Sequence, residues 1–247
     1  MRRIGVALFL VTILAGCKPA EESQLKAIIG AVLIDGTGGA PLSDSVLITA
    51  GSRIRLVGPR SNTPVPAGSE KVDGRGRFLV PELIDLASTP LPKATTLADV
   101  QQAVASGEKA LAGMIADTEN LDSAWLAELR ALRVVFVPRL ASLNGEHLER
   151  ARRNTAKMAQ SGVAISAAST GDLHKELELL LGSGLGTMEV IVAATRNAAL
   201  ARGQSETLGT LEPGKEANLL LLSANPLEDV RNLTRIARAL HRGEWVK

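Results

Sequence analysis

The hydrophobic pattern of this 247-residue chain changes its period at about residue 89, and this change restricts the possible folds more than any other feature. Up to residue 80, short runs of strand-forming residues alternate with Gly- and Pro-rich turns, which is typical of a small β module. Between residues 96 and 202, apolar residues recur at helical spacing, and the helices alternate with short buried runs. This alternation predicts parallel β/α units, so we expect an α/β protein.

Single elements can be placed from their caps and periodicity. Thr96, followed by Asp99, predicts a helix that ends near Gly107, and Asp122 or Ser123 should begin the next helix. Strands are expected at residues 110–117, 133–140 and 163–169, further helices near residues 173–181 and 188–202, and a return to β structure at residues 219–222.

Composition excludes one class of partner. Aromatic residues make up only 2% of the chain, which leaves few stacking platforms for single-stranded nucleic acid. Lys and Arg number 28 against 26 Asp and Glu, so no basic surface for a polyanion is expected. With 45% hydrophobic residues the chain can bury a large core, and we expect a protein that does not bind nucleic acid.

The first seventeen residues have the pattern of an export signal. Arg2 and Arg3 precede an apolar run at residues 4–15 that is too short to span a bilayer. Leu-Ala-Gly-Cys at residues 14–17 resembles the bacterial lipobox, in which the peptide bond before the cysteine is cut and the cysteine is lipidated. Cys17 is the only cysteine and has no intramolecular disulfide partner. An ordinary signal peptide or an uncleaved anchor is the alternative.

These features predict a lipoprotein signal peptide at residues 1–16, a lipid on Cys17 and a tether at residues 17–26. The mature protein would be anchored to a membrane of the bacterial cell envelope. Lys18, rather than an aspartate, follows the cysteine, which resembles the pattern of lipoproteins sorted to the outer membrane, facing the periplasm.

Residues 77–89, Arg-Phe-Leu-Val-Pro-Glu-Leu-Ile-Asp-Leu-Ala-Ser-Thr, resemble the first barrel strand of the amidohydrolase superfamily, in its imidazolonepropionase-like and prolidase-like branch. There a hydrophobic run and Pro-Gly-Leu-Ile-Asp precede His-x-His. The proline, leucine, isoleucine and aspartate are in register here. Glu82 replaces the glycine, and Ala87 and Thr89 stand where the histidines would be.

The end of the chain carries a second resemblance. Residues 209–219 are similar to the closing Gly-x-Ile-x-x-Gly-x-x-Ala-Asp-Leu signature of amidohydrolases, with Asn218 for the aspartate. The resemblance implies a composite β-sandwich formed by residues 27–80 and 208–247, and a partial metal-dependent-hydrolase TIM-type barrel at residues 81–207. These 127 residues are half of the roughly 250 that a complete barrel needs.

A chain of this length would keep barrel strands one, six, seven and eight, which form one contiguous four-stranded parallel patch. An open half barrel exposes an apolar concave face and two sheet edges. We therefore expect a homodimer, a partner or loops to cover it, and a rearranged compact sheet is the alternative.

The resemblance also places the metal ligands. Asp117 takes the position of the strand-six histidine, and Thr170 that of the strand-eight aspartate that acts as general base. With Ala87 and Thr89, four positions that bind metal or activate water in the family are changed. Zinc hydrolysis needs about three protein ligands and an open position for water. We therefore expect no cofactor, although the family uses zinc, and an inactive pseudoenzyme that acts by binding.

Two further functions stay open at this point. Asp172 and His174 follow the eighth strand. Asp172 should cap a helix, but both could line the mouth of the sheet with Asp117. Such a rebuilt site would support hydrolysis of C–N bonds, non-peptide or dipeptide. The third possibility is an eroding gene with little soluble product. No Gly-x-Ser-x-Gly elbow supports a serine hydrolase, and the sequence identifies no ligand.

Overall fold

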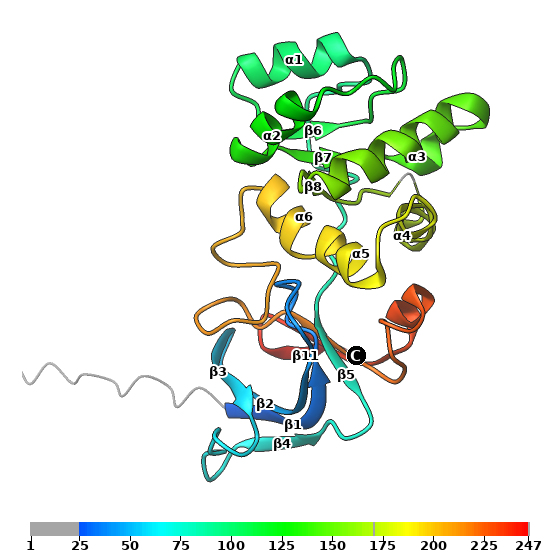
Figure 1. Ribbon diagram of the computed structural model, residues 1–247. Helices are drawn as coiled ribbons and strands as arrows, with labels where there is room; N and C mark the ends of the chain where they lie inside the picture. Colours follow the sequence, from blue (N-terminus) through cyan, green and yellow to red (C-terminus); the bar gives the residue numbers. More distant parts are fainter. Residues whose placement is uncertain (1–24, 170, 247) are drawn as a thin grey trace, which may run out of the picture.

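The computed structural model describes residues 25–169 and 171–246 (Figure 1). The expected signal peptide, the expected lipid attachment site Cys17 and the degenerate ligand position Thr170 lie outside these residues. In the part that is described, no helix combines the length and the apolar character needed to cross a membrane.

The two ends of the chain share one eight-stranded sheet, in the order β11-β10-β9-β5-β1-β2-β3, with β4 paired to β1. Its strands are β1 (Leu25–Leu33), β2 (Leu42–Ala50), β3 (Arg53–Pro59), β4 (Glu70–Asp73), β5 (Phe78–Pro81), β9 (Leu219–Leu222), β10 (Ile236–His241) and β11 (Glu244–Val246). β9 pairs antiparallel with β5, which joins the C-terminal segment to the N-terminal one. The Ile54 amide donates to the Lys215 carbonyl at 2.8 Å, so β3 also contacts the segment that precedes β9.

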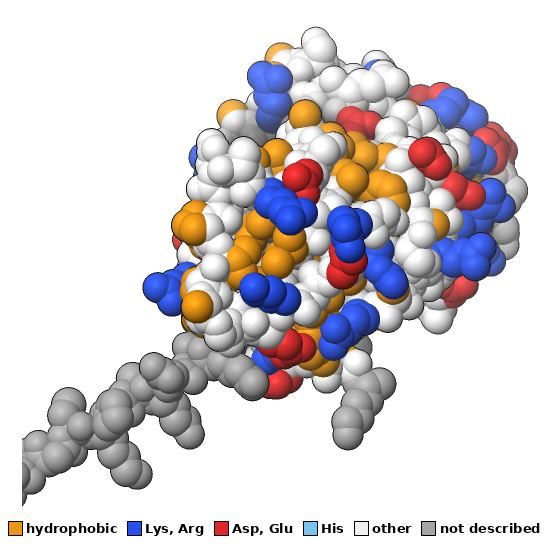
Figure 2. Space-filling model, turned by 90° about the horizontal axis from the view of Figure 1, so that it is seen from below, with side chains coloured by type: hydrophobic (Ala, Val, Ile, Leu, Met, Phe, Trp, Pro, Cys, Tyr) orange, Lys and Arg blue, Asp and Glu red, His pale blue; other side chains and the backbone are white. Residues whose placement is uncertain are grey.

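Alternation along these strands separates two layers of buried side chains. Ile28 and Leu47 point into an inner cluster with residues of β5 and β9, whereas Ala27, Val46 and Ile48 form a smaller cluster on the other face. Seen from below, the surface of this module mixes hydrophobic side chains with scattered Lys, Arg, Asp and Glu (Figure 2).

The rest of the chain alternates helices with short parallel strands. In order, these elements are α1 (Leu97–Ala105), β6 (Ala110–Ala112), α2 (Ser123–Ala131), β7 (Val135–Val137), η1 (Leu140–Ser142), α3 (Gly145–Gln160), β8 (Ala164–Ile165), α4 (Leu173–Gly182), α5 (Thr187–Ala194), α6 (Arg196–Ala201) and, after β9, η2 (Val230–Thr234). β6, β7 and β8 form a parallel sheet in that order. The expected fold class, a partial barrel with a composite β part, is confirmed.

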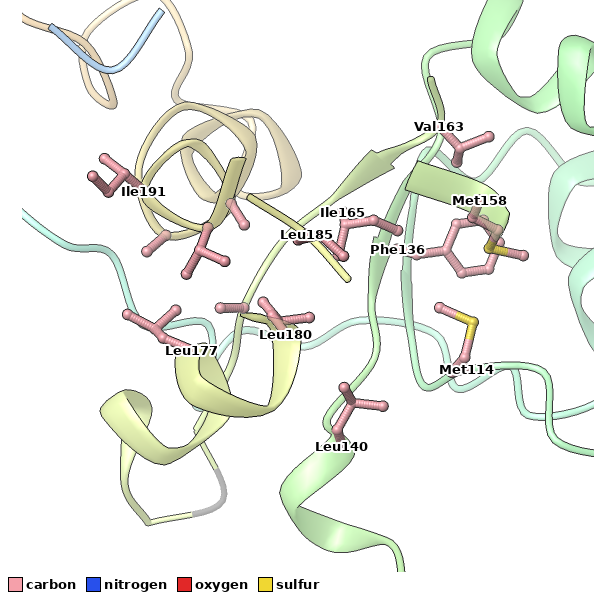
Figure 3. Packing of buried hydrophobic residues seen from close by; sticks show 14 of the residues in the cluster. Met114, Phe136, Leu140, Met158, Val163, Ile165, Leu177, Leu180, Leu185 and Ile191 are labelled. Atoms are coloured by element: carbon pink, nitrogen blue, oxygen red, sulfur yellow. The ribbon is translucent and has the colours of Figure 1, made fainter. Parts of the chain in front are cut away.

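Phe136 of β7 occupies the centre of the larger core. Its ring lies between Met158 of α3 and Met114, which follows β6 (Figure 3). Ile165 of β8 and Leu180 of α4 belong to the same cluster. The cluster continues through α5 to residues of β5 and β9, so both sheets share one core.

The expected four-stranded parallel patch is wrong, because the sheet of β6, β7 and β8 has three strands among the described residues. The motif segment supplies β5, which ends at Pro81 and belongs to the composite sheet. After Pro81 the chain passes β8 without pairing as a strand. Pro90 and Pro92 have no amide hydrogen to give to a ladder. Lys93 then forms a parallel bridge with Ala112, on the far edge of β6.

Two expected elements are shorter than their periodicity suggested. The strand that begins at residue 110 stops at Ala112, because Gly113 has a φ of 113°. The single helix expected at residues 188–202 is broken at Thr195. The Ala194 carbonyl there accepts the Ile84 amide at 2.8 Å, which takes it out of the helical ladder.

The concave face of the parallel sheet is covered within the chain. Val135 and Val137 are fully buried, and Val137 packs in one cluster with Ile84, Leu86 and Ala198 of α6. Val137 is thus covered by the segment after β5 and by α6, so the described residues show no exposed apolar face there that would support a homodimer. The dimer stays a prediction without this support.

Candidate functional site

A cavity of about 550 Å³ opens at the C-terminal ends of β6 and β7. Ligands of parallel α/β sheets bind at this end of the strands. The polar side chains that line the cavity are Lys93, Thr95, Thr96, Asp117, Arg139, Ser142 and His147. Ala112, Met114, Pro138 and Leu143 form its apolar wall.

Gly113 brings two backbone segments together at the floor of the cavity. Its amide donates to the Val137 carbonyl at 2.8 Å, which ties the end of β6 to the end of β7. A Cβ at this position would come within 2.9 Å of the Ala94 carbonyl oxygen. The Ala94 amide in turn donates to the Ala112 carbonyl at 2.9 Å. The close approach needs glycine, and it places Lys93 and Thr95 beside β6.

Arg139 lies directly after β7 in a left-handed conformation, with φ 52° and ψ 47°. Non-glycine residues adopt this region at a cost of about 1–3 kcal/mol, and such residues concentrate at ligand sites. The Glu176 carboxylate of α4 accepts the next two amides, from Leu140 at 2.7 Å and from Ala141 at 2.8 Å. Glu176 therefore fixes the turn that presents Arg139 to the cavity.

Glu176 is fully buried, and burial raises its pKa. The two backbone hydrogen bonds and the charge of Arg139 act in the opposite direction without cancelling this effect. Both carboxylate oxygens are used by backbone amides, and the Nε of Arg139 is buried without a hydrogen-bond partner. Glu176 therefore gives no hydrogen bond to the Arg139 guanidinium, and Nε has no acceptor among the described residues.

Asp117 lies on the cavity wall, and its carboxylate serves a helix. Its Oδ1 accepts the amide of Leu97, the first residue of α1, at 3.1 Å. Thr96 and Asp99 complete the start of α1 through a capping box. Asp117 therefore stabilises the positive end of α1. Its other carboxylate oxygen has no hydrogen-bond partner among the described residues.

Asp172 and His174 lie at the start of α4, and neither lines the cavity. Asp172 is the expected cap: its Oδ1 accepts the amides of His174 at 2.9 Å and Lys175 at 3.4 Å. The Nδ1 of His174 is buried without a hydrogen-bond partner. Within residues 25–169 and 171–246, no three His, Cys, Asp or Glu side chains are placed to hold a metal ion together.

Ala87 and Thr89 lie in a turn away from the cavity. The Thr89 amide donates to the Leu86 carbonyl at 3.0 Å, and Ala87 is exposed. The alanine offers no lone pair, and the hydroxyl is a poor zinc ligand. With Asp117 bound to the start of α1, the described residues at these positions do not fit the zinc centre of the family.

Asp85 joins the motif segment to the end of β8. Its carboxylate accepts the Ser169 amide at 2.8 Å and the Ser169 hydroxyl at 2.5 Å. It also accepts the Ala87 amide at 2.9 Å. Burial raises the pKa of Asp85, but these hydrogen bonds and the nearby Arg202 lower it more, and the net pKa falls below its ordinary value. Asp85 thus ties the motif segment to the residues that follow β8.

Glu82 and Asn218, which replace the glycine and the aspartate of the two family motifs, lie next to each other. Glu82, which stands for the glycine, lies with its Oε2 2.9 Å from Nδ1 of the exposed His241. Its amide donates to the carbonyl of Asn218, which stands for the aspartate, at 3.1 Å. The Asn218 side chain accepts the Arg242 amide at 2.5 Å. These residues connect β5, β9 and the turn after β10.

The sequence predictions missed Lys93 and Arg139. Arg139 could have been found, because it is the first charged residue after a buried strand, where side chains reach the ligand side of a parallel sheet. Nothing in the sequence pointed to Lys93. Its position beside β6 depends on the path of the segment that follows the motif. His147 is exposed and also lines the cavity.

A family model described as the amidohydrolase family matches residues 97–246, which is more than half of the chain. An imidazolonepropionase from Syntrophobacter fumaroxidans (strain DSM 10017 / MPOB) is 54% identical over 43 residues. This match covers 17% of the chain and only 10% of that relative.

Solved structures are similar over most of the chain. A molinate hydrolase has a TM-score of 0.74 at 12% identity, covering 92% of this chain and 95% of its own. A prolidase complexed with N-methylphosphonate-L-proline has a TM-score of 0.72 at 15% identity, covering 91% of this chain and 100% of its own. The ochratoxinase of A. niger has a TM-score of 0.66 at 14% identity, covering 92% of this chain and 96% of its own. Identities this low show only that the fold is shared. The family model, in contrast, matches the sequence itself over residues 97–246. The chain belongs to the amidohydrolase family.

Proposed function

We propose that this protein is an exported, lipid-anchored member of the amidohydrolase family that binds a small molecule and has lost zinc-dependent hydrolysis. The observation that carries the proposal is the chemistry of the cavity. At the strand ends where the family holds its metal, Lys93, Arg139 and hydroxyl groups line the wall, together with one carboxylate that caps a helix.

The loss of hydrolysis follows from the missing donors. Water attacks an amide at neutral pH when a metal lowers its pKa or a general base removes its proton. Ala87 and Thr89 replace the two histidines of the motif, and Asp117 binds the start of α1. Small-molecule binding needs only a shaped, partly apolar cavity with a few polar groups, which this site retains.

Export and anchoring are supported by the first seventeen residues. Arg2, Arg3 and the short apolar run precede a cysteine in a lipobox-like context, and Cys17 has no other cysteine to pair with. Removal of residues 1–16 would leave 26 basic and 26 acidic side chains, since two of the 28 basic residues are lost. A neutral protein is held at a membrane by its lipid rather than by charge.

The test is metal content together with turnover. The full mature chain is purified without chelator, zinc is measured by mass spectrometry, and hydrolysis of molinate and of an Xaa-Pro dipeptide is followed with and without added zinc. We expect zinc well below one equivalent and no zinc-dependent turnover. One or two tightly bound zinc ions with turnover would contradict the proposal.

A second candidate function, with less support, is C–N bond hydrolysis at a rebuilt site of Asp117, Asp172 and His174. The Nδ1 of His174 is buried without a hydrogen-bond partner among the described residues, but neither Asp172 nor His174 lines the cavity that Asp117 lines. This candidate predicts that Asp117→Ala and His174→Ala abolish turnover, while Asp122→Ala does not. Asp122 is a matched control, because it caps α2 by accepting the Trp125 amide at 2.9 Å and lies outside the cavity.

A further inference from the structure

We propose that the cavity at the ends of β6 and β7 binds a small organic acid, with its carboxylate between Lys93 and Arg139 and its apolar body against Met114 and Leu143. This inference rests on the proposed binding function and names its ligand class.

The two cations of the cavity are Lys93 and Arg139. In the described part of the chain, neither Lys93 nor Arg139 forms a salt bridge with a carboxylate. The Nε of Arg139 is buried without a partner. Because Nε is out of contact with solvent, a ligand oxygen would bind the terminal nitrogens of the guanidinium. A guanidinium fork matches a carboxylate in two parallel hydrogen bonds.

The remaining titratable groups leave the cavity positive. Asp117 is the one carboxylate on its wall, and its Oδ1 already accepts the Leu97 amide. His147 is the other titratable side chain there. Glu176, behind Arg139, turns both oxygens to the amides of the η1 turn. Lys93 and Arg139 are thus two basic side chains against the single carboxylate of Asp117 on the cavity wall.

The shape of the site favours a carboxylate with an apolar body over a phosphate. The volume of about 550 Å³ lies in the range of small-molecule sites, and five apolar residues, Ala112, Met114, Ala116, Pro138 and Leu143, are part of the lining. A phosphate would use the free amides of a helix N-terminus. Here Thr95 and Thr96 donate their amides to Asp99 at 3.2 and 3.0 Å, and the Leu97 amide is bound to Asp117. A phosphate dianion would therefore meet carboxylates at the start of α1.

Arg139 is a binding residue that the fold holds in advance. The left-handed turn and Glu176 fix the backbone at this position, so a bound ligand would have to order only the side chain. Lys93 comes from the segment beside β6, on the other side of the cavity floor. A carboxylate between them would connect the two segments that Gly113 holds together.

Calorimetry on the full mature chain tests the inference with 3-phenylpropionate and its neutral amide, 3-phenylpropionamide. These probes share size and shape and differ in charge. We expect the acid to bind about tenfold more tightly than the amide. Arg139→Gln and Lys93→Gln should each weaken binding of the acid by about tenfold and leave binding of the amide unchanged.

Arg133→Gln is the matched control. Arg133 also has a positive φ, of 56°, and precedes the same strand, outside the cavity. It should leave the affinity for the acid unchanged. Lys93 is exposed, so its variant is expected to fold even if an Arg139 variant does not. Thermal melts of all variants establish folding before titration.

Three results would overturn the inference: equal affinity for acid and amide, an effect of Arg133→Gln as large as that of Arg139→Gln, or inorganic phosphate that displaces the acid at a lower concentration than the acid's own Kd. The measurements also distinguish failure of the proposed function from failure of this inference. Stoichiometric zinc with turnover in the same sample removes that function, whereas loss of acid selectivity in zinc-free protein removes the ligand class alone.

Discussion

Replacement of Asp85 by alanine tests how the motif segment is joined to the parallel sheet. The Asp85 carboxylate accepts three hydrogen bonds, two from Ser169 and one from Ala87. A hydrogen bond to a charged group contributes about 1.5–3 kcal/mol when it is shielded, and exposure to solvent reduces this. Because Asp85 is half-buried, we take the low end for each bond and allow water to replace part of the loss. Asp85→Ala should lower the free energy of unfolding by about 2–4 kcal/mol.

The assay is urea unfolding of four proteins at pH 7: the parent, Asp85→Ala, Ser169→Ala and the double variant. The cycle should give a coupling energy of about 1–2 kcal/mol between Asp85 and Ser169. Asp122→Ala, which removes an exposed helix cap, is the control and should cost about 1 kcal/mol.

The pH dependence follows from the lowered pKa of Asp85. A carboxylate whose pKa falls on folding stabilises the folded state above its ordinary pKa of 3.8, and this contribution is lost as the pH falls through the lower folded pKa. Asp85→Asn should therefore be destabilised relative to the parent at pH 7, and the difference should narrow below pH 3.8. A coupling energy near zero, or a difference that is constant down to pH 2, would refute this account of the joint.

Three further predictions concern the core, the cavity floor and the anchor. Phe136→Ala should cost about 3–5 kcal/mol in urea unfolding, because the ring is fully buried, and a cost below about 1.5 kcal/mol would contradict the described packing. Gly113→Ala should destabilise by about 1–3 kcal/mol through its φ and the contact with Ala94. Gly107→Ala, with a positive φ but open space, should cost less in the same assay, and an equal cost would argue against the contact. Cys17→Ser should move the protein from the membrane fraction to the soluble fraction and abolish labelling by a radioactive fatty acid, and an unchanged distribution would argue against lipidation.

Helix starts were predictable because the residues that determine them are local. The side chains of Thr96, Asp122 and Asp172 each accept an amide two or three residues ahead, and each begins a helix as expected. Asp99 completes the first cap by accepting the Thr96 amide. The extent of the strands was not predictable in this way. Apolar residues continue to Ile115, but Gly113 leaves the strand conformation to bring its amide to a carbonyl of β7.

The candidate site shows the same division between local and tertiary information. The loss of ligands at Ala87 and Thr89 could be seen by aligning one motif. The role of Lys93 could not be seen in the sequence, because it depends on the path that residues 82–92 take between the two sheets. Glu176 was also missed, since a glutamate in a helix gives no sign that its carboxylate will bind amides 35 and 36 residues earlier.

The rearranged motif segment connects these observations. In the family this segment is a barrel strand, whereas here it leaves β5 and covers the concave face with Leu86. Its turn carries Ala87 and Thr89 away from the cavity, and Asp85 holds that turn against the end of β8. The same path brings Lys93 to the opposite edge, beside β6.

Two of the positions that align with metal ligands, Ala87 and Thr89, are therefore separated in space from the cavity, whereas a third, Asp117, lies on its wall. A ligand in the cavity would contact Lys93 and Arg139 without meeting the turn at Ala87. Substitutions at Ala87, including Ala87→His, should thus leave binding in the cavity unchanged. Ala87→His should also fail to recruit zinc, because Thr89 and Asp117 cannot complete the donor set from where the chain has placed them.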